Sequence, residues 1–343
     1  MPAVDPIVFF GTPDFAVPTL AALVAAGRAP VCAVTQPSRR AGRGQEAQDP
    51  PVARWARAHG LPVVQPERVG APDFLAELRG LAPGIAVVVA FGQIFPRDLL
   101  ALPAHGCINL HASLLPRWRG AAPIQAAVAA GEERTGVTTM QMEAGLDSGP
   151  ILLQEEVAIG PEETAGELSR RLAATGAALV VRTLDELERG TLTPLPQGSE
   201  LATYAPRLTR ESGKVDWSLS AAALADRLRA YTPWPGLTAE LAGAPVKVVR
   251  ARTLASTRTA GTARTPGTEC GTSSLESLLS LESWGGEGPP PGTILGLRDG
   301  RLAVACGGGS VLAVEELQRP GRKAVQAAAF VNGERLRPGD RFS

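Results

Sequence analysis

The 343-residue chain has few of the side chains that bind metals or form disulfides. It contains three histidines and four cysteines, and no two cysteines form a Cys-x-x-Cys pair. Because this spacing builds neither a zinc site nor a disulfide framework, we expect no metal and a reducing compartment. The 34 basic and 34 acidic residues balance, so no overall charge attracts nucleic acid. Any nucleic-acid contact must therefore come from a local basic segment.

Long apolar runs are also missing, since no stretch of about eighteen apolar residues occurs that could span a membrane. The first residues lack the basic and apolar regions of a signal peptide. We therefore expect a soluble, cytoplasmic protein that does not bind membranes. The length of 343 residues favours two domains. The sequence gives no direct sign of the oligomeric state, and a monomer is our expectation.

Short apolar runs alternate with amphipathic segments through the first half, which favours βαβ units and a mostly parallel sheet. The expected strands are residues 7–10, 31–35, 62–64, 85–90, 107–110 and 137–142. The expected helices are residues 15–26, 51–59, 73–79 and 121–130. A longer helix follows, where Thr164 and Glu167 match a capping box and Gly190 ends the helical pattern. These elements predict an α/β domain over residues 1–190.

The second half has a different composition. Residues 191–206 contain prolines and are expected to be a linker to a second domain at 207–343. That domain is predicted to have a helix at Ala221–Ala230 and a small β-barrel, with strands at residues 238–240, 246–251, 292–297, 301–305 and 311–317. Residues 255–290 are rich in Ser, Thr, Gly and Pro and have too little apolar surface to fold, so we expect a mobile insertion.

Three polar side chains follow expected strands of the first domain. Asn109 and His111 are two residues apart, so an extended backbone projects both to one side, near the edge where open α/β sheets bind ligands. Asp147 follows the next strand, between Gly145 and Gly149. Each residue alone has an ordinary structural explanation. Together, an amide, an imidazole and a carboxylate indicate an acyl-transfer centre.

Other chemistries lack their sequence motifs. Residues 10–15 follow the first strand, where a dinucleotide fold has its glycine-rich turn, but the Gly-x-Gly-x-x-Gly pattern is absent. This disfavours a nicotinamide-dependent oxidoreductase. No Gly-x-Ser-x-Gly elbow supports a covalent hydrolase. An RNA-binding barrel protein without enzymatic activity would leave the three polar residues without a purpose.

Residues 108–125, INLHASLLPRWRGAAPIQ, closely resemble methionyl-tRNA formyltransferases of the folate-dependent formyltransferase family. Residues 136–142 with 145–149 resemble a second signature of that family, and residues 10–13 and 41–44 match it too. The resemblance covers nearly the whole chain. It implies a Rossmann-like formyltransferase domain joined to an OB-like β-barrel. The implied activity is formyl transfer from 10-formyltetrahydrofolate to methionyl initiator tRNA for translation initiation, with release of tetrahydrofolate.

The resemblance also implies roles for the polar residues. Asn109 and His111 would stabilise negative charge on the formyl oxygen. Asp147 would act as general base or would hold His111 as an imidazolium, and the sequence leaves both routes open. The alternative function is folate-dependent formylation of another amine, such as a sugar nucleotide or glycinamide ribonucleotide, since such enzymes share the three residues.

Binding residues are implied in the same way. The expected folate contacts are Phe91, Gly92, Ser113, Leu114, Leu115 and Pro116. The expected tRNA contacts are Arg39, Arg40 and Arg43. Family members usually carry lysines where this chain has Gln45 and Glu46, so we expect fewer phosphate contacts from this segment.

Overall fold

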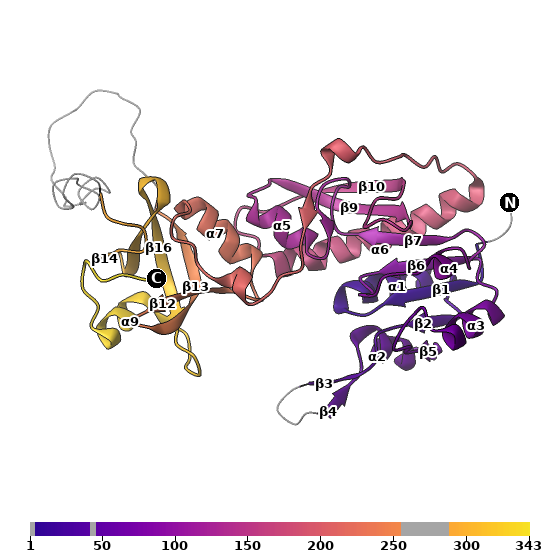
Figure 1. Ribbon diagram of the computed structural model, residues 1–343, viewed down its shortest axis with the longest axis horizontal. Coiled ribbons are helices and arrows are strands. Elements are labelled where there is room, and N and C mark those ends of the chain that lie inside the picture. Colours follow the sequence, from indigo (N-terminus) through magenta and orange to yellow (C-terminus); the bar gives the residue numbers. More distant parts are fainter. Residues whose placement is uncertain (1–3, 42–45, 255–287) are drawn as a thin grey trace. The chain divides into compact units, whose positions relative to one another are not determined.

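The computed structural model describes residues 4–41, 46–254 and 288–343 (Figure 1). They form two compact units. Unit 1 comprises Met1–Ala127 with Glu132–Arg207, and unit 2 comprises Val128–Gly131 with Leu208–Ser343. Most of the predicted insertion, residues 255–287, lies outside the described residues. Within the described ranges, no helix combines the length and the apolar character needed to cross a bilayer.

Unit 1 is built on a seven-stranded sheet with the order β10-β9-β7-β6-β1-β2-β5. The strands are β1 Ile7–Gly11, β2 Cys32–Val34, β5 Val63–Val64, β6 Ile85–Val89, β7 Cys107–His111, β9 Arg134–Gln141 and β10 Ile151–Ala158. Neighbours from β7 to β5 are parallel, whereas β9 runs antiparallel to both of its neighbours, β7 and β10. The predicted mostly parallel α/β sheet is confirmed. Uninterrupted apolar strands such as IVFFG suit a sheet that is buried on both faces.

Helices cover both faces of this sheet (Figure 1). They are η1 Asp14–Ala16, α1 Val17–Ala25, α2 Pro51–Ala58, α3 Pro72–Gly80, α4 Arg97–Leu100, α5 Pro123–Ala129 and α6 Ala165–Arg189. On one face, Phe74 of α3 and Leu99 of α4 pack in a cluster with Phe10. On the other, α6 approaches Leu110 so closely that a Cβ on Gly176 would lie 2.6 Å from its Cδ2 atom. This packing fixes β7, which carries two of the predicted catalytic residues.

The ends of α6 form as the sequence predicts. Thr164 and Glu167 make the reciprocal capping box, and Gly190 takes a left-handed conformation at the C-cap. The segment predicted as a linker, residues 191–206, has backbone contacts within unit 1. It contains η2 Ser199–Leu201 and β11 Tyr204–Ala205, and β11 pairs with β8 Arg119–Gly120. A separate hairpin joins β3 Arg39–Ala41 to β4 Glu46–Gln48.

Unit 2 is an antiparallel sheet with the order β12-β13-β16-β15-β14, to which β17 adds beside β16. Its elements are η3 Glu211–Gly213, α7 Ala221–Ala230, β12 Leu237–Leu241, β13 Ala244–Thr253, β14 Ile294–Arg298, β15 Arg301–Cys306, η5 Gly307–Gly309, β16 Ser310–Gln318, β17 Val325–Gln326 and α9 Ala327–Glu334. The C-terminal residues bridge both edges, since Phe342 pairs with Leu241 and Arg341 pairs with Thr293. This closure gives the predicted barrel-like module.

Candidate active site

Strand β7 brings Asn109 and His111 to the carboxyl edge of the parallel strands. Asn109 lies between Val88 of β6 and Met140 of β9, and His111 lies opposite Thr138. Cys107 is on the same strand, two residues before Asn109, and it packs on the face of the sheet that α3 and α4 cover. Because side chains alternate along a strand, Asn109 and His111 belong to that same face. The shared side predicted from their spacing agrees with this pattern. Burial raises the pKa of the Cys107 thiol to about 12, so this neighbouring cysteine stays protonated at neutral pH.

Asp147 lies in the loop between β9 and β10, with a left-handed backbone at φ 47°. Gly149 allows the close turn, because a Cβ there would collide with the Gln141 carbonyl oxygen. The Asp147 Oδ2 atom accepts a hydrogen bond from the Gly120 backbone N–H at 2.7 Å. The same oxygen lies 3.7 Å from His111 Nδ1, which is too far for a direct hydrogen bond. The carboxylate and the imidazole therefore face each other but form no direct hydrogen bond.

The other imidazole nitrogen is already occupied. His111 Nε2 lies 2.9 Å from the Trp118 carbonyl oxygen, and a carbonyl can only accept. Nε2 must therefore carry a hydrogen. In the neutral ring the lone pair is then on Nδ1, facing Asp147, and any hydrogen that His111 gives to a substrate must come from Nδ1 of the imidazolium.

A cavity of about 280 Å³ adjoins these groups. Its polar lining includes Asn109 and Asp147. Two of the predicted folate-binding residues, Phe91 and Gly92, also line it. Apolar walls come from Val88, Phe95, Met140 and Met142. Asn109 is half-buried, and its side chain has no hydrogen-bond partner in the part of the chain that the structure describes. An amide without a partner at the wall of an apolar cavity is available to a ligand.

The other predicted folate residues do not line this cavity. Ser113 is fully buried, and its hydroxyl donates to the Arg117 carbonyl at 2.6 Å. Leu115 is also buried, and its N–H donates to the Thr138 hydroxyl at 3.2 Å. Leu114 and Pro116 are half-buried. The role of residues 113–116 in folate binding stays a prediction.

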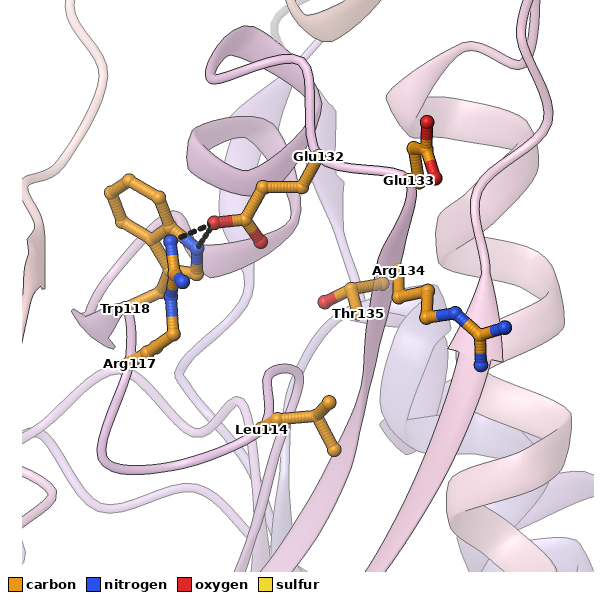
Figure 2. A pocket seen from close by; sticks show the side chains of 7 residues that line it. All are labelled: Leu114, Arg117, Trp118, Glu132, Glu133, Arg134 and Thr135. Atoms are coloured by element: carbon orange, nitrogen blue, oxygen red, sulfur yellow. Dashed lines mark hydrogen bonds and ion pairs between the residues drawn. The ribbon is translucent and has the colours of Figure 1, made fainter.

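Leu114 instead lines a second cavity of about 430 Å³ (Figure 2). Figure 2 shows the side chains of Arg117 and Trp118 meeting at the Glu132 carboxylate. The indole N–H of Trp118 donates to Glu132 Oε1 at 3.1 Å, and Arg117 forms an ion pair with the same oxygen. The residue whose carbonyl accepts from His111 is thus also fixed through its side chain.

Two of the three predicted tRNA residues, Arg39 and Arg40, lie on β3. Arg39 is exposed, Arg40 belongs to the same strand, and Arg43 lies outside the described residues. Their contacts with tRNA stay predictions. In the described ranges, no group of three or more His, Cys, Asp or Glu side chains could hold a metal ion.

Two residues near the site were not predicted from the sequence. Gln197 and Thr203 lie in the segment expected to be a linker. Gln197 donates a hydrogen bond to the Asp147 carbonyl, and the Thr203 hydroxyl accepts one from the Trp118 N–H. Residues 203–206 also match the formyltransferase family, but nothing in the residue type of Gln197 or Thr203 indicates a contact with the site. Their contacts span 50 and 85 residues of sequence.

Sequence profiles of known families match both units. The formyl transferase profile matches residues 6–184, and the profile of the formyl transferase C-terminal domain matches residues 207–335. The methionyl-tRNA formyltransferase of Geobacter metallireducens is 44% identical over 98% of this chain and 98% of its own length. That of Anaeromyxobacter dehalogenans strain 2CP-1 is 46% identical over 96% and 97%, respectively.

Solved structures share the fold at low identity. An N-formyltransferase from Helicobacter canadensis, in complex with folinic acid and dTDP-3-aminofucose, has a TM-score of 0.62 at 15% identity and covers 90% of this chain and 98% of its own. HypX from Aquifex aeolicus, in complex with tetrahydrofolic acid, has a TM-score of 0.56 at 16% identity and covers 96% and 47%. The fold and the two profiles define the class of formyl transferases. With relatives of 44% and 46% identity over nearly its full length, the chain belongs to the methionyl-tRNA formyltransferase family.

Proposed function

We propose that this chain transfers the formyl group of 10-formyltetrahydrofolate to the α-amino group of methionyl initiator tRNA and so supplies N-formylmethionyl-tRNA for translation initiation. The observation that carries the proposal is the identity of 44% to 46% with methionyl-tRNA formyltransferases over both units. The sugar N-formyltransferases among the solved structures share only the fold, so nothing specific favours a sugar acceptor. As an enzyme of translation, the chain is proposed to work in the cytoplasm as a monomer.

The lining of the cavity beside Asn109 supports binding of the ring of a folate there. Its walls are apolar and aromatic, as a flat heteroaromatic ring requires, and the unpartnered Asn109 amide offers both a donor and an acceptor. The complexes of the Helicobacter and Aquifex proteins with folinic and tetrahydrofolic acid support a folate donor. When bound, such a folate supplies a formyl group on a nitrogen that can leave. Phe91 and Gly92 are the proposed residues that hold it.

Formyl transfer to an amine places negative charge on the formyl oxygen. A donor fixed toward that oxygen before the reaction stabilises the charge without reorganisation. The Asn109 side-chain N–H groups are the proposed donors, because the fold uses neither. His111 can add a second donor only from Nδ1 and only as an imidazolium, because Nε2–H is bound to the Trp118 carbonyl. We therefore propose that His111 donates to the formyl oxygen only as an imidazolium.

The attacking amine must also lose a proton. The His111 Nδ1 and Asp147 Oδ2 atoms are 3.7 Å apart, and a nitrogen or a water oxygen about 2.8 Å from each would fit between them. Asp147 is the proposed base, since a carboxylate accepts whichever form His111 takes. A neutral His111 would share the proton with Asp147 through Nδ1. An imidazolium has no lone pair to accept it and would instead keep Asp147 in its charged form. Either way, the proton leaves the nitrogen toward this pair.

The direct test is a competition among acceptors. The purified chain is incubated with 10-formyltetrahydrofolate and with methionyl initiator tRNA, an amino sugar nucleotide or glycinamide ribonucleotide. Formylation of methionyl-tRNA alone is the expected result, and free methionine is the matched control for the need for tRNA. Formylation of a small amine, with none of methionyl-tRNA, would overturn the proposal.

A further inference from the structure

Residues 195–205 run past both loops that hold the proposed catalytic residues. Leu195 exchanges two backbone hydrogen bonds with Ile151, each 2.8 Å long, and β11 pairs in parallel with β8. Between these two anchors, the side chains of Gln197 and Thr203 reach the Asp147 loop and the Trp118 loop. A segment expected to be a linker therefore makes specific contacts at the site.

Both the nitrogen and the oxygen of the Gln197 side-chain amide form two hydrogen bonds. Its Nε2 donates to the Asp147 carbonyl at 2.9 Å and to the Gly149 carbonyl at 2.7 Å. Its Oε1 accepts from Arg119 Nε at 3.1 Å and from an Arg119 terminal nitrogen at 2.7 Å. Carbonyls only accept and a guanidinium only donates, so the amide has one consistent orientation. Gln197 thus ties both sides of the Asp147 turn to a buried arginine.

The hydrogen bonds between Gln197 and Arg119 are unusual because they pair a buried charged group with a neutral amide. Arg119 is 6% exposed, and among the described residues no carboxylate lies within ion-pair distance of it. A glutamate at position 197 would neutralise the guanidinium but could not donate to the two carbonyls. The neutral amide is the side chain that satisfies both partners at once.

Thr203 holds the peptide that binds His111. Its hydroxyl accepts from the Trp118 N–H, and its carbonyl accepts from the Arg119 N–H, both at 2.8 Å. The Arg119 N–H and the Trp118 carbonyl belong to one planar peptide, and that carbonyl accepts from His111 Nε2. Trp118 has φ 58°, a left-handed conformation that is strained for a bulky residue and needs such support. Thr203 therefore sets the direction of the carbonyl that orients the imidazole.

We propose that Gln197 and Thr203 are positioning residues of the formyl-transfer reaction. Gln197 fixes the turn that carries Asp147, and Thr203 fixes the peptide that orients His111. Neither Gln197 nor Thr203 lines the cavity beside Asn109. Their effect is therefore expected to act through Asp147, which lines the cavity, and through His111, which adjoins it. A catalytic group displaced by about 1 Å can lose about two orders of magnitude in rate, which is why such supports matter. The inference rests on the proposed function.

Two substitutions at position 197 separate its contacts. Q197E keeps an acceptor for Arg119 but removes the donor to the Asp147 and Gly149 carbonyls, whereas Q197A removes both. We expect each variant to lower kcat by about 10-fold to 100-fold, with KM for folate and for methionyl-tRNA changed by less than about threefold. A wild-type kcat in Q197E together with a loss in Q197A would show that the Arg119 contact alone matters, and would overturn the role at Asp147.

Two substitutions at position 203 test the contact with Trp118. T203V removes the hydroxyl acceptor at similar size, and T203S restores it. Nitrogen-15 NMR of the imidazole rings reports the tautomer without any turnover, and H111Q assigns the signal among only three histidines. We expect a hydrogen on Nε2 in wild type and T203S, and mixed signals with reduced kcat in T203V. An unchanged His111 signal and kcat in T203V would overturn the role of Thr203.

A destabilising change elsewhere in unit 1 is the control. T164A removes the cap of α6 and should lower the melting temperature by about 2–4 °C while kcat stays unchanged. If kcat instead falls with melting temperature in T164A as it does in Q197A and T203V, the two residues are only structural. A wild-type chain that formylates no tRNA would overturn the proposed function, yet the His111 tautomer would still test the positioning contacts.

Discussion

Two groups of facing polar side chains in unit 1, one at Arg28 and one at His111, differ in how fully they are paired. Arg28 donates to both carboxylate oxygens of Glu188, at 2.8 and 2.5 Å, and to Asp185 at 2.8 Å. His111 and Asp147, by contrast, remain 3.7 Å apart. The first cluster is closed by its own hydrogen bonds. The second leaves room for a further atom.

The difference agrees with one group stabilising the fold and the other acting in the proposed reaction. The Arg28 guanidinium lowers the pKa of the Glu188 carboxyl, which is the effect of a satisfied ion pair. Beside Asp147, the Asn109 amide faces a cavity without a partner. Unpaired polar groups at a cavity cost stability, and a protein gains from them only when a ligand completes the pairing. Substitutions should therefore affect activity at one place and stability at the other.

The largest effect is expected from substitutions of Asp147 and His111. D147N keeps an oxygen for the Gly120 N–H but loses the charge, and H111A removes the imidazole. We expect each to lower kcat by about 10³-fold, the range for loss of a general acid or base. Single-turnover formylation of methionyl-tRNA measures this, and calorimetry with a folate should still detect binding.

The closed cluster supplies the matched control for these variants. D185N makes the same chemical change as D147N in the same unit, but at Arg28. We expect its single-turnover rate to equal that of wild type. Near-wild-type transfer by D147N or H111A, or an equal loss in D185N, would remove the contrast between the clusters.

A somewhat smaller effect is expected at Asn109. N109A should lower the rate of transfer by about 10² to 10³-fold, as expected for one lost donor at a developing oxyanion. Because the side chain has no partner among the described residues, the melting temperature should stay within about 1 °C of wild type. The two measurements are single-turnover kinetics and a thermal melt. A loss confined to the KM for folate would make Asn109 a binding residue instead.

Local sequence patterns predicted the elements whose signals are themselves local. The parallel strands, the capping box at Thr164 and the end of α6 at Gly190 follow from apolar runs and cap residues. Strand β10 does not, because the exposed Gln154, Glu155 and Glu156 interrupt its apolar pattern. Helix α9 is also unpredicted, since its short sequence AAAFVNGE gives little periodicity.

The site shows the same division. Asn109, His111 and Asp147 are recognisable as polar residues at strand ends, and residues 145–149 mark a tight turn. The bond between His111 and the Trp118 carbonyl depends on a left-handed tryptophan, which no propensity favours. The contacts of Gln197 join residues 48 to 78 positions apart. Such bonds arise from the packed fold and leave no pattern in the sequence.

The predicted tRNA-binding arginines offer a third kind of charged group, expected to act on affinity alone. Replacing Arg39, Arg40 and Arg43 together with alanine should weaken tRNA binding by about 10-fold and reduce the slope of log K against log salt by about one per lost phosphate contact. Binding is titrated at several salt concentrations, and kcat at saturating tRNA should be unchanged. A wild-type affinity that does not respond to salt would contradict phosphate-led binding.

The smallest effect is expected at the closed cluster. R28M should lower the free energy of unfolding of unit 1 by about 1 kcal/mol at pH 7, because the Arg28 side chain is 16% exposed and its partners are 30% to 35% exposed. The folded pKa of Glu188 is lowered, so its contribution is complete above its unfolded pKa of about 4.3 and disappears as the pH falls through the folded pKa.

The difference between wild type and R28M should therefore shrink on acidification, as urea unfolding at pH 7 and at the lowest pH that preserves the fold would measure. R182M is the matched control, since the Arg182–Glu155 pair has exposed fractions of 49% and 45% and should contribute little at either pH. An equal difference for R28M at both pH values would assign its effect to lost packing of the arginine stem. Unchanged kcat in R28M would complete the contrast, because the Arg28 guanidinium already donates to Glu188 and Asp185 and has no role in the proposed reaction.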